Sequence, residues 1–184
     1  YETTGLNVFS RCTDTLDYLV SRIRYCDDLG GRFVVIGSPT VRNTELSRKS
    51  SWANYCWLLN SALEKTKSSD VKILTEALPT CPVFSSVFDL LQLVEYFECS
   101  RLGLHMDLNS MMAANELIAV RDSDFKRIEH VHINDSTFNP VAPGHRQAEL
   151  TICAEILEKN SYDGLVGLEY VTPSGLRPNS GQLL

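Results

Sequence analysis

The sequence predicts an α/β fold built from parallel βαβ units. Short apolar runs rich in β-branched residues alternate with longer stretches whose apolar residues recur at helical spacing. Parallel neighbouring strands need a long crossover connection, usually a helix, so this alternation favours a parallel sheet. The length of 184 residues and the 43% hydrophobic content fit a single domain, 1–184, and no linker or low-complexity tract divides it. Periodicity alone fits either an open five-stranded sheet or part of an eight-stranded barrel.

The predicted helices come from runs of apolar residues on one face. In 13–29, the apolar residues between Leu16 and Cys26 share one stripe, and Gly30 and Gly31 then end the helix. The same spacing predicts further helices over 51–65, 86–97, 112–120 and 149–159.

The predicted strands are short and rich in β-branched residues. The first, Arg-Phe-Val-Val-Ile-Gly, is typical of a buried strand, and a turn follows it at 37–39. The end of the chain, 173–184, is rich in Pro, Gly and Ser and predicts an irregular tail. Strands are predicted over 32–37, 71–76, 102–108, 129–134 and 165–170.

Charge and cysteine content restrict the class of partner. The formal net charge of −6 disfavours nucleic acid as the main partner, because phosphate backbones are bound by basic surfaces. No run approaches the ~20 apolar residues of a membrane span, and the first ten residues lack the features of a signal peptide. The six cysteines form no C-x-x-C pair, which predicts free thiols in a cytoplasmic protein.

Four of the predicted strands end in a potential metal ligand: Glu76, Asp107, His132 and Glu169. These residues lie 31, 25 and 37 residues apart, close to the roughly 31 residues of one βα unit in an eight-unit barrel. Whole-unit spacing places side chains at the same end of a parallel sheet, so the four are expected to converge. Carboxylates with one imidazole suit Mg²⁺ or Mn²⁺ and tolerate Co²⁺ or Zn²⁺.

Each of these residues also has a simpler interpretation. A carboxylate after a strand is often a helix N-cap, which applies to Glu76 and to Asp107. His130 and His132 alternate with apolar residues and share a strand face, where a packed, hydrogen-bonded pair is common. The joint pattern favours a cation site, because four independent strand ends rarely agree by accident.

At these residues the sequence resembles the xylose-isomerase-like TIM-barrel family of sugar isomerases and epimerases, of the tagatose-epimerase and hydroxypyruvate-isomerase type. The segment 29–39 is similar to the family's fourth strand, and Glu76 and Asp107 stand at its fifth-strand and sixth-strand ligands. The segment His-Val-His-Ile-Asn-Asp at 130–135 is similar to the seventh strand, and 162–170 is similar to the last. The resemblance implies a TIM (β/α)8 barrel, here partial with about five βα units and without its N-terminal strands.

The resemblance also implies proton transfer through an enediolate on a ketose or related hydroxycarbonyl substrate. Glu76, Asp107, His132 and Glu169 would bind one divalent metal ion, with Mn²⁺ or Mg²⁺ favoured, to stabilise the developing charge. Glu76 and Glu169 would act as the catalytic base and acid. Return of the proton to the opposite face gives epimerisation, and return to the neighbouring carbon gives isomerisation.

Substrate contacts are expected from Ser110, Asp135 and Arg146. Ser110 stands where the family often has a histidine, and it donates a hydrogen bond but carries no charge. Phe138 stands where related epimerases often have an arginine. Arg146 could hold an anionic substrate group or be a solvated loop arginine.

Two further expectations concern completeness and alternative functions. A chain of 184 residues that opens with Tyr1 allows about six βα units, so we expect a fragment, a proteolysed product or a partial barrel completed by another chain. The partner that completes the barrel is either a second copy, in a homo-oligomer, or another chain. Ser110 and the missing strands also fit a non-catalytic domain that binds metal or a partner without turnover. A dehydratase remains open, whereas an abasic-site endonuclease is disfavoured by the acidic charge and by only four histidines.

Overall fold

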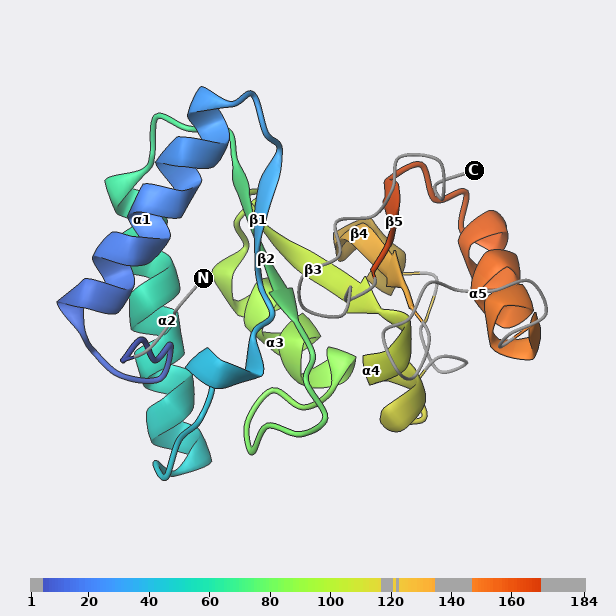
Figure 1. Cartoon of the computed structure of the whole chain (residues 1–184), viewed down its shortest axis with the longest axis horizontal. Coiled ribbons are helices and arrows are strands. Elements are labelled where there is room, and N and C mark those ends of the chain that lie inside the picture. The colour runs from blue at the N-terminus through green and yellow to red at the C-terminus, as the bar shows by residue number, and fades with distance from the viewer. Residues whose placement is uncertain (1–4, 117–120, 122, 135–146, 170–184) are drawn as a thin grey trace, which may run out of the picture.

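A computed structural model describes residues 5–116, 121, 123–134 and 147–169, and it contains one sheet of five parallel strands in chain order (Figure 1). The strands are β1 (Phe33–Ile36), β2 (Lys72–Glu76), β3 (Leu102–Asp107), β4 (Ile128–Ile133) and β5 (Leu165–Leu168). The helices are α1 (Thr13–Asp28), α2 (Arg48–Lys65), α3 (Val87–Phe97), α4 (Leu108–Ala113) and α5 (Gln147–Lys159), with 3₁₀ turns η1 (Pro39–Val41) and η2 (Asp124–Arg127).

The sheet is part of a (β/α) barrel. Each strand pairs in parallel with the next one along the chain, and helices flank the sheet, with α1 and α2 on the β1 side and α5 on the β5 side (Figure 1). Among the described residues no strand pairs with the outer edge of β1 or of β5. The predicted α/β class, the parallel sheet and the partial barrel are thus confirmed.

Local capping explains where the helices begin. The Ser47 hydroxyl accepts a hydrogen bond from the backbone N–H of Ser50, so α2 starts one turn before the predicted 51–65. The Ser86 hydroxyl caps α3 in the same way. The predicted helix over 112–120 is wrong at its start, because α4 begins at Leu108 directly after β3 and ends at Ala113. Residues 117–120 lie outside the described ranges, as does the predicted tail at 173–184.

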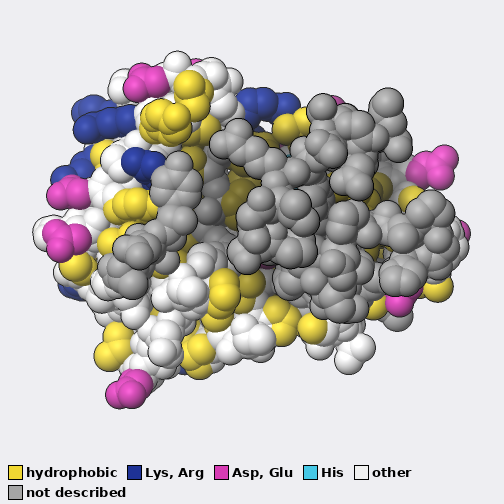
Figure 2. Space-filling view, in the orientation of Figure 1, with side chains coloured by type: hydrophobic (Ala, Val, Ile, Leu, Met, Phe, Trp, Pro, Cys, Tyr) yellow, Lys and Arg dark blue, Asp and Glu magenta, His cyan; other side chains and the backbone are white. Residues whose placement is uncertain are grey.

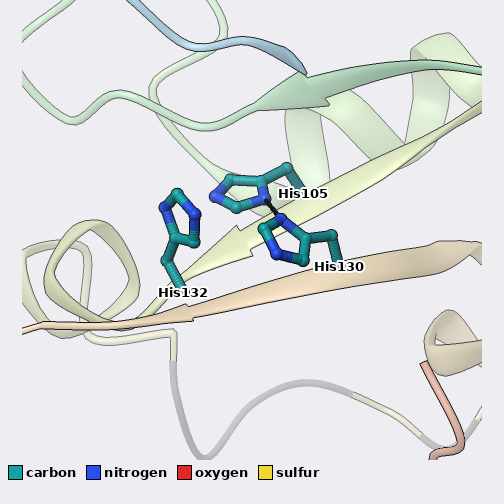
Figure 3. Close-up of side chains that lie close together, drawn as sticks. All are labelled: His105, His130 and His132. Atoms are coloured by element: carbon teal, nitrogen blue, oxygen red, sulfur yellow. Dashed lines mark hydrogen bonds between the residues drawn. The ribbon is translucent and has the colours of Figure 1, made fainter. Parts of the chain in front are cut away.

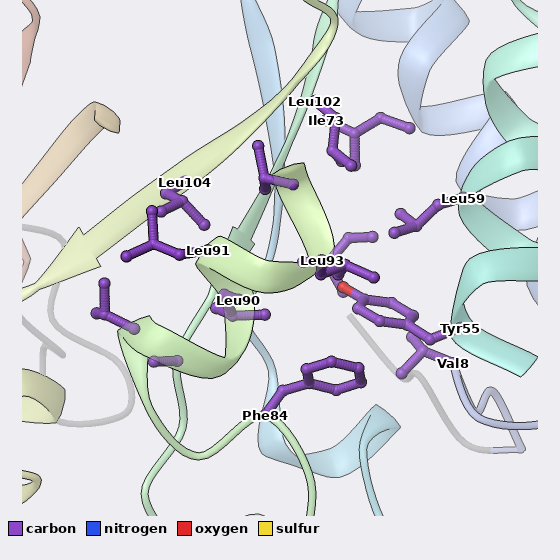
Figure 4. Packing of buried hydrophobic residues seen from close by; sticks show 14 of the residues in the cluster. Val8, Tyr55, Leu59, Ile73, Phe84, Leu90, Leu91, Leu93, Leu102 and Leu104 are labelled. Carbon is purple, nitrogen blue, oxygen red and sulfur yellow. The ribbon is translucent and has the colours of Figure 1, made fainter. Parts of the chain in front are cut away.

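The main core lies between the sheet and helices α2 and α3 (Figure 4). Tyr55 and Leu59 of α2, Leu90 of α3 and Ile73 of β2 are fully buried in this one cluster. A fully buried side chain of this size contributes on the order of 1.5–3 kcal/mol. The packing holds β2 and β3 firmly in place, and with them the residues at their C-terminal ends.

The edges and surface are more exposed. Val35 of β1 is 39% exposed, and on β5 Leu165, Val166 and Leu168 are 49%, 47% and 67% exposed. On the face drawn in Figure 2, Lys and Arg side chains gather toward the α1 side, while Asp and Glu are scattered around the periphery.

No helix within the described ranges is long and apolar enough to cross a membrane. All six cysteines are free, and none is fully exposed, as predicted.

Candidate functional site

The four predicted ligands come from four neighbouring strands. Glu76 is the last residue of β2, Asp107 is the last of β3, His132 lies near the end of β4, and Glu169 follows β5. Asp107 pairs with His132 in the register of β3 and β4, and the backbone N–H of Glu169 donates to the carbonyl of Ile133 at 3.0 Å. Since the strands are parallel, all four residues lie at the C-terminal edge of the sheet.

Three of the four form a compact group. Asp107, His132 and Glu169 each offer one ligand atom within 4.8 Å of the others, and Nδ1 of His132 lies 3.7 Å from Oε2 of Glu169. Glu76 belongs to an overlapping group with Asp107 and His105, on the same 4.8 Å limit. All four predicted ligands line one cavity of about 990 Å³.

Asn134 ties two of the carboxylates together. This fully buried residue follows β4, and its side-chain amide donates to Oδ2 of Asp107 at 2.5 Å and to Oε2 of Glu169 at 2.9 Å. Its Oδ1 accepts from the backbone N–H of Asn109 at 3.2 Å. The amide thus fixes the orientation of both carboxylates. In the sequence, Asn134 is recognisable only as part of the motif at 130–135, which assigns it no role.

Asp107 has the capping role that sequence analysis weighed as its simpler interpretation. Its Oδ1 accepts a hydrogen bond from the backbone N–H of Ser110 at 2.8 Å and so caps α4. The cap also places Ser110 on the wall of the cavity. Capping and membership of the site coexist, because a carboxylate accepts several hydrogen bonds or ligands at once.

The electrostatics of the cavity favour a bound cation. Burial, with the negative charges of Asp107 and Glu169, raises the pKa of Glu76 to about 8 against the opposing charge of Arg42. Negative groups this close repel one another, and a divalent cation between them would relieve that repulsion. The donor set of three carboxylates and one imidazole fits such an ion.

Arg42 is a buried cation that could not be recognised from the sequence. It is 1% exposed, and its guanidinium donates to the backbone carbonyl of Glu76 at 2.5 Å and also to that of Ile36. These carbonyls end β2 and β1, so Arg42 joins the two strand ends behind Glu76. A single arginine in a loop carries no periodic signal.

Gly37 sits directly against the carboxylate of Glu76. A Cβ atom at this position would collide with Oε2 of Glu76, so the close approach depends on the missing side chain. Gly37 follows β1 and lines the same cavity.

His105 completes a cluster of three imidazoles with His130 and His132 (Figure 3). It is 1% exposed, and its Nδ1 lies 3.0 Å from Nδ1 of His130 in a hydrogen bond. Burial, helped by His132 and His130, lowers the pKa of His105 to about 3, and burial also lowers the pKa of His130. The simpler interpretation of His130 was a packed, hydrogen-bonded pair with His132. In the structure His130 forms its hydrogen bond with His105 instead. Residues two apart in a strand point to the same face, so His105 could have been placed on the face of Asp107 from the sequence alone.

Two predicted substrate contacts, Asp135 and Arg146, lie outside the described residues.

The comparisons with known proteins agree with this architecture. The model of the family described as "Xylose isomerase-like TIM barrel" matches residues 9–183. No curated protein sequence matches the chain.

Several solved structures share the fold at low sequence identity. The 3-keto-D-glucoside 4-epimerase YcjR from E. coli is 13% identical with a TM-score of 0.77, over 92% of this chain and 70% of that one. The D-psicose 3-epimerase from Clostridium cellulolyticum H10 is 13% identical with a TM-score of 0.72, over 92% and 62%. The IolI protein with a bound zinc atom is 17% identical with a TM-score of 0.68, over 88% and 62%. The chain thus spans about two thirds of each neighbour's length, and with the family match across nearly all of its own residues it belongs to the xylose isomerase-like TIM-barrel family.

Proposed function

We propose that the chain acts as a divalent-metal-dependent sugar isomerase or epimerase on a ketose or related hydroxycarbonyl compound. The observation that carries this proposal is the lining of one cavity by Glu76, Asp107, His132 and Glu169, each from a different strand. The described neighbours whose names give an activity are epimerases of sugars or ketoglycosides, which supports the same class of substrate.

We assign the cation to these four side chains. Three carboxylates and one imidazole suit Mn²⁺ or Mg²⁺, and Co²⁺ or Zn²⁺ is compatible with the same donors. The ion, when bound, would supply the positive charge that stabilises the oxygens of an enediolate. Asn134 would hold Asp107 and Glu169 in the orientation needed for binding, because its amide already donates to both.

Glu76 and Glu169 are the proposed proton carriers. They come from β2 and from the end of β5, so they approach the cavity from separate strands. One carboxylate removes the proton from the carbon beside the carbonyl, and the other returns a proton. Delivery to the opposite face of that carbon inverts it, and delivery to the neighbouring carbon exchanges ketose and aldose. A dehydratase would share the first of these steps.

The proposed substrate contacts are Ser110, Asp135 and Arg146. The position of Ser110 on the cavity wall supports a hydrogen bond to a substrate hydroxyl. Arg146 suits an anionic substrate group.

A second candidate is a domain that binds metal without turnover. Ser110 favours it, because a serine replaces the imidazole that relatives often place beside the substrate. Metal binding without proton exchange is the behaviour that separates this candidate from an enzyme.

The test is solvent exchange of substrate hydrogen. The protein with Mn²⁺ is incubated in D₂O with D-psicose, D-tagatose, L-ribulose and a 3-ketoglucoside, and deuterium at carbon is followed by NMR. We expect exchange with at least one of these substrates, and a loss of about 10²–10⁴-fold in Glu169→Gln and in Glu76→Gln. The matched control is Glu129→Gln, since Glu129 pairs with Lys72 away from the cavity. Full exchange by Glu169→Gln would contradict the acid–base pair, and tight Mn²⁺ binding with no exchange would favour the non-catalytic domain.

The partners we propose include a protein chain that covers the open edges. The exposed apolar residues of β5, Leu165, Val166 and Leu168, support a homo-oligomer or another chain completing the barrel. Light scattering of the purified protein should give a mass above that of one chain, and a monomer with these residues exposed would contradict this. The six free cysteines support a reducing compartment such as the cytoplasm.

A further inference from the structure

We propose that His105, His130 and His132 form a second cation site, made of imidazoles alone, that takes a borderline divalent cation such as Zn²⁺. The three side chains lie on one face of β3 and β4 (Figure 3), and His105 stands two residues before Asp107 along β3. It differs in donor chemistry from the carboxylate-rich set proposed above and shares only His132 with it. The inference therefore does not require the proposed sugar chemistry.

The three side chains already have the spacing of a ligand set. One ligand nitrogen from each lies within 4.8 Å of the other two, and the Nδ1 atoms of His105 and His130 are 3.0 Å apart. Nitrogens bound to a tetrahedral Zn²⁺ at about 2.0–2.1 Å lie roughly 3.3 Å from one another. A shift of a few tenths of an ångström at the His105–His130 pair, with an inward movement of His132, would bring them to that geometry.

The surroundings leave room for the imidazoles. Gly167 of β5 faces the cluster, and a Cβ there would lie 3.2 Å from Nε2 of His130 and 3.3 Å from Cδ2 of His132. A ligand set of three imidazoles prefers Zn²⁺, Co²⁺ or Ni²⁺ over the hard Mg²⁺ and Mn²⁺.

The test compares two cations on two variants. Zn²⁺ and Mn²⁺ affinities of the purified protein are measured by calorimetry and, for Mn²⁺, by electron paramagnetic resonance. We expect His130→Gln to weaken Zn²⁺ binding by at least about tenfold while Mn²⁺ binding stays within about twofold. The matched variant Glu76→Gln should do the opposite, because Glu76 is in the carboxylate set but not in the imidazole set. Circular dichroism shows whether each variant is folded.

A second measurement needs no substitution. Co²⁺ is bound to the unaltered protein, and exchangeable imidazole N–H resonances with large paramagnetic shifts are counted by NMR. Three such resonances are expected if all three imidazoles of the cluster bind, and one if His132 alone binds. Unchanged Zn²⁺ affinity in folded His130→Gln, or a single shifted resonance, would overturn the proposal. If the unaltered protein bound Zn²⁺ but not Mn²⁺, that result would instead count against the proposed sugar chemistry, so the two failures are distinguishable.

Discussion

Asn134 donates a hydrogen bond from its side-chain amide to Oδ2 of Asp107 at 2.5 Å. The same amide nitrogen also reaches Oε2 of Glu169 at 2.9 Å, and Asn134 itself is fully buried. The residue at the end of β4 therefore connects a carboxylate at the end of β3 with one at the end of β5. Hydrogen bonds to ionised groups are among the stronger ones in proteins, so this bridge both stabilises the fold and orients the site.

Asn134→Ala should weaken both properties. Loss of the two hydrogen bonds is expected to lower the free energy of unfolding by about 2 kcal/mol and Mn²⁺ affinity by about 10–100-fold. Urea unfolding and a Mn²⁺ titration measure these effects. The control is Asn160→Ala, because the Asn160 amide donates to the backbone carbonyl of Ile156 at the end of α5, away from the cavity. An Asn134→Ala protein with unchanged Mn²⁺ affinity would show that the bridge does not orient the ligands.

Gly37→Ala should impair the site more than the fold. The added methyl group would collide with the end of the flexible Glu76 side chain, which can move away at little cost in stability. We expect a change in unfolding free energy within about 1 kcal/mol but a loss of exchange activity on the order of 10²-fold, because catalysis depends on the position of this carboxylate.

The control for Gly37→Ala is Gly31→Ala. Gly31 lies just before the first residue of β1, whereas Gly37 follows its last residue. A Cβ there would lie 2.5 Å from Sγ of Cys26 and 3.0 Å from the Cys26 backbone oxygen, so this variant should lose stability with its Mn²⁺ affinity retained. Equal losses of activity in the two variants would argue that Gly37 acts only through stability.

Much of the site followed from the sequence because a parallel sheet converts chain spacing into position. Glu76, Asp107, His132 and Glu169 stand at strand ends, so predicting the strands was enough to place them at one edge. The partial barrel followed from the same spacing together with the family resemblance.

The residues that sequence analysis missed act through contacts that no period encodes. Arg42 reaches strand-end carbonyls from a loop, and Asn134 was one letter in a recognised motif. The start of α4 was missed for a related reason. From the sequence, Asp107 could be a helix cap or a metal ligand. In the structure Asp107 is the N-cap of α4, so that this helix begins at Leu108, directly after β3.

Arg42→Lys should destabilise the ends of β1 and β2. The guanidinium donates to two backbone carbonyls at once, a fork that a lysine ammonium does not reproduce. We expect a loss of about 1.5–3 kcal/mol in the free energy of unfolding, measured in urea. Arg24→Lys serves as the control because Arg24 is exposed and its hydrogen bond to the Lys65 carbonyl is long, at 3.4 Å, and it should change stability by less than about 0.5 kcal/mol. Equal effects of the two substitutions would contradict a structural role for Arg42.

Glu76→Gln should change how the stability of the metal-free protein depends on pH. Burial and the charges of Asp107 and Glu169, opposed by Arg42, raise the pKa of Glu76 to about 8 in the folded protein from its ordinary value of 4.5. Between these values the folded protein holds a proton that the unfolded chain has lost, so stability falls as the pH rises through this interval. Glutamine has no such proton, and the variant should therefore gain stability relative to the unaltered protein between about pH 5 and about pH 9.

Urea unfolding in the presence of a chelator measures the pH effect, with Glu129→Gln as the control that should show no such gain. Saturating Mn²⁺ should then reverse the ranking at the higher pH. A cation that binds only the folded state stabilises it by mass action, and the variant that lacks the Glu76 carboxylate benefits less. If Glu76→Gln showed the same pH dependence as the unaltered protein without metal, the carboxyl would have to titrate at its ordinary pKa. The repulsion between Glu76 and its two acidic neighbours, which favours a cation at this position, would then be absent.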